Sequence, residues 1–251
     1  MAHLARSVPA MVNESALASF PRSVVRDLLD TLLPAHCPGC GRRGAPICAH
    51  CRAGLARAPA APPPEPVAWW AACFAYEGVA RELVARAKYR HERRSLEAVT
   101  RLLAAAVEAA PVTADLVTWV PASAARLRSQ GVDHGELLAR GVSRLTSSPL
   151  SMCLERAPGT AQTGLDARSR RVGPRLRARG DVAGRVVLVV DDVATTGGTL
   201  ASAARALLVA DARAVHAVTV ARTPPPGWAG GRRAYTPPTP ITRPTFAHRT
   251  R

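Results

Sequence analysis

The stretch GRVVLVVDDVATTGGTLASAARALLVADA, Gly184 to Ala212, decides the fold of this chain. From Gly184 to Val190 its residues after Arg185 are all apolar, which is typical of a strand covered on both faces. Two aspartates end the run, and a loop of threonines and glycines follows before a helical pattern begins at about Thr199. A strand, a turn and a helix in this order predict one unit of a parallel sheet.

The rest of the middle of the chain repeats this alternation. Strand patterns are expected over 67–78, 114–121, 150–157 and 213–223, and helical patterns over 79–90, 95–110, 135–145 and 199–210. We therefore predict an α/β fold, a parallel sheet with helices on both faces. Right-handed crossovers would place the loops that follow the strands along one edge of that sheet.

The chain divides by composition into five parts. Residues 1–21 show no firm period, and residues 22–57 combine a short amphipathic helix, ended by Pro34, with a cysteine-rich module. A proline-rich linker follows at 58–66, and the α/β domain is expected over 67–222. Residues 223–251 contain seven prolines among basic residues, a pattern of a disordered tail.

Charge and hydropathy limit the classes of function. The net charge of +16 attracts polyanions such as nucleic acids and phosphorylated metabolites, although heavy use of arginine can also reflect a codon-composition bias. The sequence contains no run of about 18 apolar residues, so no transmembrane helix is predicted. The first residues lack the apolar segment of a secretory signal, so the cytoplasm is the expected location.

The loop after the aspartates is suited to a phosphate. Gly197 and Gly198 can adopt positive φ, and the first N–H groups of the following helix have no partner within it. The hydroxyl groups of nearby threonines add further donors, and no lysine follows the glycines as in a Walker loop. We predict a monophosphate site formed by six residues: Ala194, Thr195, Thr196, Gly197, Gly198 and Thr199.

Asp191 and Asp192 need a different role, because carboxylates beside a bound phosphate would repel it. They fit a ligand whose hydroxyl groups need acceptors, and a ribose 5-phosphate offers both groups. The alternative is a buried strand with a capping turn and two solvated acids.

Four cysteines predict a metal site. Cys37 and Cys40 are separated by two residues, and Cys48 and Cys51 repeat that spacing. Two such knuckles can close a tetrahedral Zn²⁺ site, which would be structural because no ligand position stays open. Disulfides would require an oxidising compartment, and the remaining Cys73 and Cys153 fall in strand patterns, where cysteine is usually a small buried apolar residue.

These motifs together resemble the type I phosphoribosyltransferases and, more narrowly, the ComF family, which is linked to competence and DNA uptake. The resemblance covers about residues 32–222. It rests on the cysteine quartet, VPASAARLRSQGVDHGELLAR at 120–140, GTAQTGLDARSRR at 159–171, and VVLVVDDVATTGGTL at 186–200. It implies a type I phosphoribosyltransferase-like sheet preceded by a small zinc module, with the donor's ribose on Asp191 and Asp192 and its 5-phosphate on the loop.

The resemblance also implies a pyrophosphate site with Mg²⁺ after the strand that ends at Pro121. Its expected residues are Pro121, Ala122, Ser123, Arg126 and Lys88, the last of these the sole lysine of the chain. Arginines suit a diphosphate because their fork pairs with two oxygens, but Arg126 could instead lie on a solvated basic helix. Gln162 and Arg168 match a flexible loop over the active site. The segment QGVDHGE at 130–136 departs from the Arg-Gly-Phe-Asn-Gln-Ala often found in ComF members.

Three functions remain open. The first is a Mg²⁺-dependent pentosyltransferase that uses 5-phosphoribosyl 1-diphosphate, with no residue identified as general base and no acceptor identified. The second is a single-stranded DNA-binding competence factor, possessing the fold and acting with other DNA-uptake proteins. The third is a regulator that senses the donor without turning it over.

Overall fold

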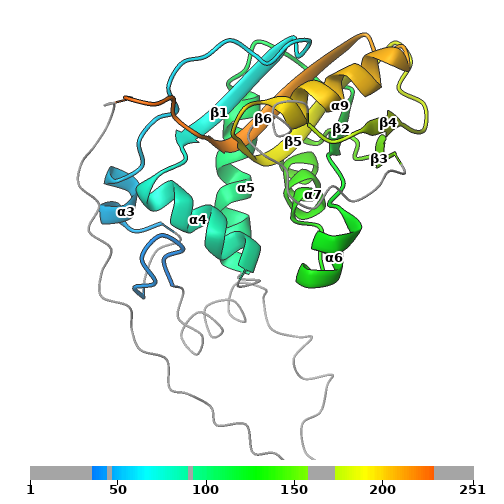
Figure 1. The fold of residues 1–251 in the computed structure, drawn as a ribbon. Helices are drawn as coiled ribbons and strands as arrows, with labels where there is room; N and C mark the ends of the chain where they lie inside the picture. The colour runs from blue at the N-terminus through cyan, green and yellow to red at the C-terminus, as the bar shows by residue number, and fades with distance from the viewer. Residues whose placement is uncertain (1–35, 44–46, 90–92, 158–172, 229–251) are drawn as a thin grey trace, which may run out of the picture. The chain divides into compact units, whose positions relative to one another are not determined.

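The computed structural model describes residues 36–43, 47–89, 93–157 and 173–228 (Figure 1). The chain divides into two units, residues 1–35 and 36–251, and the described residues all belong to the second. The expected helix over 22–33, the loop residues Gln162 and Arg168, and the tail from residue 229 lie outside the described residues. Among the described helices, none has the length and apolar content needed to span a bilayer.

Four parallel strands form the central sheet in the order β1-β6-β5-β2. Their bounds are Trp69–Ala75 for β1, Leu116–Trp119 for β2, Val186–Ala194 for β5 and Ala214–Arg222 for β6. Strand β5 lies inside the sheet, where Val190 pairs with Val218 of β6 and with Trp119 of β2. Strands β5 and β6 are mostly buried, as expected where helices cover both faces.

Helices cover both faces of this sheet (Figure 1). Helices α4 (Gly78–Tyr89), α5 (Arg93–Glu108) and α7 (His134–Thr146) pack on one face, and α9 (Gly198–Val209) packs on the other. Alternate β5 side chains serve the two cores. Leu188 and Val190 join the cluster with α4, α5 and α7, whereas Val187 and Val189 join the cluster with α9. The predicted parallel sheet with helices on both faces is confirmed.

One predicted strand belongs to a different sheet. Residues 150–157 were expected to add to the parallel sheet, but β3 (Leu154–Arg156) pairs antiparallel with β4 (Leu176–Ala178) in a separate two-stranded sheet. Only Leu154 of β3 is buried, so this short strand has little apolar surface with which to enter the main sheet. The start of the predicted strand does meet the main sheet, because Leu150 forms a parallel bridge with Val117 at the outer edge of β2.

The cysteine-rich module packs directly on helix α4. It contains the short helix α3 (Ala49–Ala53), and its buried Cys37 and Cys51 belong to the same apolar cluster as Val79 and Leu83 of α4. The approach is close, since a Cβ added to Gly39 would lie 2.9 Å from Val79 Cγ1. The module therefore shares the core of the sheet domain.

Candidate functional site

The carboxyl end of β5 carries both predicted ribose-binding acids. The strand continues to Ala194, so Asp191 and Asp192 lie within it and not after its expected end at Val190. Both side chains are half-buried, and Asp191 Oδ1 accepts a hydrogen bond of 2.8 Å from the backbone N–H of Asp192. Two adjacent carboxylates are thus held at the edge of the sheet where the neighbouring parallel strands also end.

Lys88 contacts one of these acids. Its Nζ atom lies 2.5 Å from Asp192 Oδ2, and both side chains are less than one fifth exposed. Lys88 was expected beside the pyrophosphate loop, and the structure places it against the acid predicted to hold ribose. Burial, followed by the charge of Asp192, raises the pKa of Asp191 to about 7, while the N–H of Asp192 and the charge of Lys88 oppose that rise.

A glycine N-cap links β5 to helix α9. The helix begins at Gly198, one residue before the expected start, and its N-cap Gly197 has a φ of 76°. Gly197 has no side chain to cap the helix, and the N–H of Gly198 donates to Thr196 Oγ1 at 3.4 Å. The dipole of α9 favours an anion at this end of the helix. Thr195 and Thr196 are exposed there. That these residues bind a phosphate stays a prediction.

The proline-rich linker contacts the same loop. A Cβ added to Gly197 would lie 2.6 Å from Pro64 Cγ, so Pro64 packs directly against the turn. Two hydrogen bonds hold this part of the linker, from Val67 N to Pro64 O at 2.7 Å and from Arg222 Nη1 to Pro59 O at 3.1 Å. The linker thereby covers one side of the N-cap glycine.

The predicted pyrophosphate loop joins β2 to α6 (Ala124–Gln130). Ser123 is the N-cap of α6 and accepts a hydrogen bond of 3.3 Å from Arg126 N. Arg126 is exposed on this helix, which agrees with the alternative of a solvated basic helix. It also lines the cavity described below. Two groups hold the loop backbone: Arg156 Nε donates to Pro121 O at 2.7 Å, and Ala122 N donates to Asp133 Oδ2 at 2.8 Å.

A cavity of about 320 Å³ brings the predicted residues together. Those that line it are Asp191, Asp192, Thr195, Thr199, Lys88, Pro121, Ala122 and Arg126. A larger and more open hollow of about 660 Å³ lies between β4 and α9, but none of the predicted ribose, phosphate or pyrophosphate residues lines it. The smaller cavity is therefore the candidate ligand site.

Sequence reasoning missed two charged residues of this cavity, Asp133 and Arg156. Arg156 lies on β3 after the buried Leu154, and its side chain is largely exposed. Partial loss of hydration, followed by the charge of Arg126, lowers its pKa. Asp133 is followed three residues later by Glu136, a pattern that is typical of a helix N-terminus. That signal could have drawn attention to Asp133. No comparable local signal marks Arg156.

The four cysteines form one cluster. Their sulfur atoms all lie within 4.8 Å of one another, and Cys40 Sγ is 3.8 Å from Cys48 Sγ. A tetrahedral site with Zn–S bonds of about 2.3 Å would separate its sulfurs by roughly 3.8 Å. There is no room for a side chain at Gly39, where a Cβ would lie 2.7 Å from Cys51 Sγ. The donor set and its spacing fit Zn²⁺.

The thiols of this cluster differ in acidity. Burial raises the pKa of Cys37, but N–H donors from Cys48, Cys40 and Gly39 outweigh it and bring the pKa down to about 7. Burial raises the pKa of Cys51. The predicted small apolar cysteines lie elsewhere, with Cys153 buried and Cys73 half-buried.

Part of the chain is similar to known proteins. Residues 132–229 match the family described as phosphoribosyl transferase domain, and no curated protein matches the chain. Among solved structures, glutamine phosphoribosylpyrophosphate amidotransferase from B. subtilis is 24% identical, with 55% of this chain and 30% of that chain covered and a TM-score of 0.39. Adenine phosphoribosyltransferase from Leishmania donovani is 17% identical, with 55% and 56% covered and a TM-score of 0.38.

The chain spans about a third of the length of the amidotransferase and about half that of the adenine enzyme. The matched segment starts just before Asp133 and runs through β5, the loop and α9 to the end of β6. Both aspartates and all six residues of the predicted phosphate site lie inside it. Residues 132–229 are therefore similar to the phosphoribosyl transferase domain, over less than half of the chain.

Proposed function

We propose that the protein binds 5-phosphoribosyl 1-diphosphate with Mg²⁺ and transfers its phosphoribosyl group to an acceptor. One observation carries this proposal: two half-buried aspartates at the end of β5 directly precede a glycine-capped helix, and they share a cavity with the loop after β2. The match to the phosphoribosyl transferase domain over 132–229 supports it.

Each part of the donor has a counterpart in the site. The 5-phosphate would accept hydrogen bonds from the first turn of α9 and from the threonines before it. The ribose hydroxyls would donate to Asp191 and Asp192. The diphosphate would lie beside Pro121–Ser123, where Arg126 and Lys88 supply positive charge. Mg²⁺ would neutralise the diphosphate, and hard carboxylate and phosphate oxygens are its preferred ligands.

The reaction exchanges one bond at the sugar for another. The bond from ribose C1 to the diphosphate oxygen breaks, and its electron pair leaves with pyrophosphate. A nucleophilic atom of the acceptor forms the new bond to C1 and gives up its proton. The chain's own contribution would be to hold the sugar and to stabilise the departing negative charge, which is the larger part of catalysis for such transfers.

A binding titration and a product measurement test this proposal. Wild-type protein should bind the donor with Mg²⁺, and pyrophosphate should appear only when a suitable acceptor is added. The double variant Asp191→Asn with Asp192→Asn should lose at least about tenfold in affinity, the loss expected when charged hydrogen bonds are removed. A control with the same charge change, Asp181→Asn with Asp211→Asn, alters two exposed acids and should bind normally. Equal binding by both double variants would refute the site.

The same experiment separates transfer from sensing. A protein that binds the donor tightly but releases no pyrophosphate with any acceptor would be a donor-sensing regulator. In either case we propose the cytoplasm as the place of action, because the donor is a phosphorylated metabolite.

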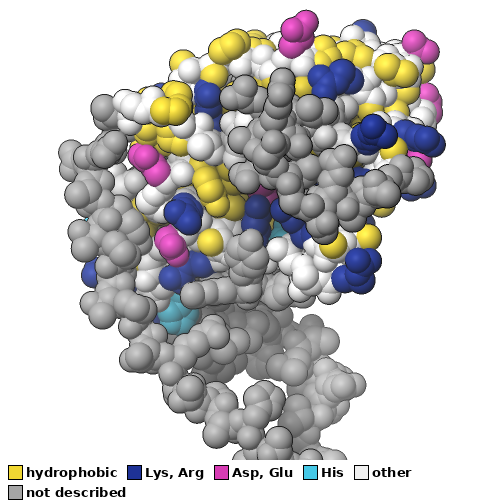
Figure 2. Space-filling view, in the orientation of Figure 1, with side chains coloured by type: hydrophobic (Ala, Val, Ile, Leu, Met, Phe, Trp, Pro, Cys, Tyr) yellow, Lys and Arg dark blue, Asp and Glu magenta, His cyan; other side chains and the backbone are white. Residues whose placement is uncertain are grey.

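A second candidate function is the binding of single-stranded DNA in the competence role that the ComF resemblance suggests. Arg177 on β4 and the flanking Arg175 and Arg179 are exposed at alternate positions, the spacing of one strand face. Figure 2 shows dark blue side chains gathered on the right of the view, where Figure 1 places β3 and β4. Affinity for a single-stranded oligonucleotide should fall steeply with salt, and less steeply after Arg177→Ala and Arg179→Ala. Binding that salt does not weaken would exclude this function.

A further inference from the structure

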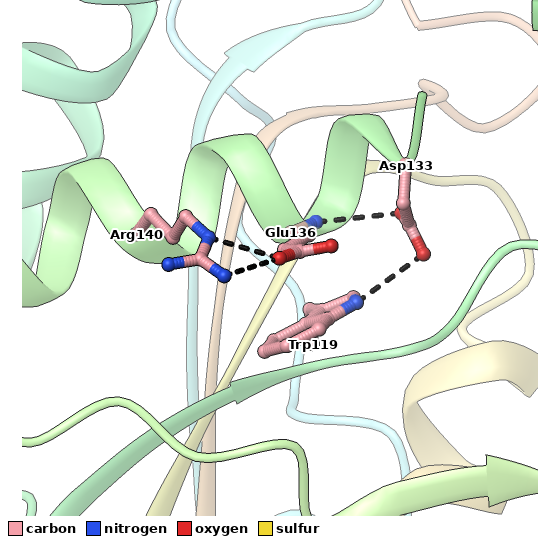
Figure 3. Close-up of polar contacts among 4 residues, drawn as sticks. All are labelled: Trp119, Asp133, Glu136 and Arg140. Carbon is pink, nitrogen blue, oxygen red and sulfur yellow. Dashed lines mark hydrogen bonds and ion pairs between the residues drawn. The ribbon is translucent and has the colours of Figure 1, made fainter. Parts of the chain in front are cut away.

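The carboxylate of Asp133 is fully engaged by hydrogen-bond donors from two parts of the chain (Figure 3). Its Oδ2 atom accepts from Ala122 N at 2.8 Å and from Trp119 Nε1 at 3.3 Å. Its Oδ1 atom accepts from Gly135 N at 3.0 Å and from Glu136 N at 3.4 Å. One oxygen therefore holds the loop after β2, and the other caps helix α7.

Only a carboxylate satisfies all of these contacts. Both oxygens of Asp133 face N–H groups alone, and an ionised carboxylate is a side chain whose two atoms are both acceptors. An asparagine would turn an NH₂ group toward N–H donors on one side or the other. A serine could still cap α7 but is too short to reach Ala122. Asp133 thus has a role beyond capping α7, which is its contact with Ala122.

The contact with Ala122 fixes the backbone beside the ligand cavity. Ala122 lies at the centre of the segment Pro121–Ser123, and the carbonyl of Pro121 is held from the other side by Arg156. A Cβ added to Gly135 would lie 3.3 Å from Asp133 Oδ1 and 3.3 Å from Trp119 Cδ1, so little space surrounds the Asp133 carboxylate. The loop is held at two successive residues by side chains from α7 and β3.

The four N–H donors to Asp133 also explain how a carboxylate can face an anionic ligand. Asp133 lines the same cavity as Arg126 and Arg156, where a diphosphate would be repelled by a solvated acid. Four N–H donors neutralise much of its charge and leave its lone pairs committed. Asp133 is thereby unsuited to act as a general base or a metal ligand, and suited to fix the loop.

We propose that Asp133 is a positioning residue for the diphosphate part of the donor, acting through the Pro121–Ser123 backbone. This inference rests on the proposed function, since it assigns one residue to one portion of that ligand. It predicts that Asp133 governs how strongly the site distinguishes 5-phosphoribosyl 1-diphosphate from ribose 5-phosphate, which lacks the diphosphate.

The test compares the dissociation constants of these two probes by calorimetry, with Mg²⁺, for wild type and three variants. Asp133→Asn keeps the size of the side chain, and Asp133→Ser keeps the helix cap. Both variants should bind the diphosphate donor about tenfold more weakly, the scale of one charged hydrogen bond. Their dissociation constants for ribose 5-phosphate should stay within twofold of the wild-type value. The control Glu136→Gln makes the same charge change on α7, where the Glu136 side chain is paired with exposed Arg140 (Figure 3); it should alter neither constant.

Three outcomes decide the matter. A smaller preference for the diphosphate donor over ribose 5-phosphate in both Asp133 variants supports the inference, even if one variant also loses stability. Equal weakening of both probes, or no change in the ratio, overturns the role of Asp133 and leaves the proposed function standing. A wild-type protein that does not prefer the diphosphate donor overturns the proposed function, and the inference that rests on it falls as well.

Discussion

Lys88 Nζ lies 2.5 Å from Asp192 Oδ2, and this ion pair joins the last turn of α4 to the end of β5. The pair is half-buried, unlike the exposed pairs Arg101–Glu97 and Arg140–Glu136 on helix surfaces. Burial strengthens such an interaction and makes its one-sided removal costly. Helix α4 is also the element on which the cysteine-rich module packs, so one helix connects that module with the acid pair.

Replacing the lysine should therefore destabilise the protein. Lys88→Met leaves Asp192 half-buried without its partner, and we expect the free energy of unfolding to fall by about 1.5–3 kcal/mol. Arg101→Met, which removes an exposed pair, should cost less than about 1 kcal/mol. Urea unfolding at pH 8 measures both. Equal costs for the two variants would contradict a special role for the Lys88 pair.

The raised pKa of Asp191 gives opposite pH trends for binding and stability. Only the ionised carboxylate is a pure acceptor for ribose hydroxyls, so donor affinity should rise as the pH increases through about 7. The folded-state pKa lies above the unfolded value of about 3.9, so the stabilising contribution is complete below that value and is lost as the pH rises through about 7. Asp191→Asn should remove both trends.

Calorimetry and denaturant unfolding between about pH 5 and pH 9 would show these trends. The phosphates of the donor also titrate near pH 6, so the informative quantity is the difference between wild type and Asp191→Asn. Asp181→Asn, at an exposed acid, supplies the control. A wild-type profile that parallels that of Asp191→Asn would show that Asp191 does not titrate in this range.

The cysteine cluster should hold one Zn²⁺ per chain. Cys40→Ser should lose the metal, whereas Cys73→Ser should keep it, because the thiol of Cys73 lies on β1 and donates to Leu102 O at 3.7 Å. Elemental analysis of the purified proteins provides the measurement. Full metal content in Cys40→Ser would mean that this cysteine is not a ligand.

Removal of the metal should lower the stability of the whole described domain. Cys37 and Cys51 belong to the same core as Val79 and Leu83 of α4, so loosening the module exposes apolar surface on that helix. A chelator should lower Tm by at least about 6 °C, the shift expected for a loss of roughly 3 kcal/mol in a chain of this size. An unchanged melting curve after verified loss of zinc would argue that the module packs without its metal.

Two glycine substitutions separate backbone strain from crowding at the phosphate loop. Gly184 and Gly197 both have positive φ, but a Cβ at Gly184 meets open space and one at Gly197 meets Pro64. Gly184→Ala should cost about 1–2 kcal/mol from the backbone alone. Gly197→Ala should cost about 1–3 kcal/mol more, because overpacking adds to that strain. It should also weaken the binding of ribose 5-phosphate. Equal costs in denaturant unfolding would show that Pro64 yields freely.

The parts of the site that are local in sequence could be predicted. A strand of apolar residues, two acids, a glycine turn and a helix are all fixed by short-range pattern, and β5 and α9 follow it to within a few residues. The aspartates and the loop were identified for the same reason. The four-cysteine cluster was also predicted, because metal-ligand spacing is a local signal.

The contacts that depend on packing could not be predicted. Lys88 reaches Asp192 only because α4 packs on the sheet in one particular orientation. Arg156 reaches the loop because β3 leaves the main sheet and pairs with β4, a choice that three residues of β-pattern do not reveal. Asp133 follows a helix-start pattern, but its second partner, Ala122, is brought to it by the folding of the intervening helix α6.

The contact between Pro64 and Gly197 changes how the residues before β1 should be regarded. A proline-rich stretch between two modules is usually treated as a spacer whose length can be altered at will. Here, trimming or exchanging residues 59–66 would strip the cover from the turn at which an anion would bind. Any chimera that joins a new amino-terminal module to this sheet must therefore retain that stretch, because a junction at residue 67 would remove Pro64 from its contact with Gly197.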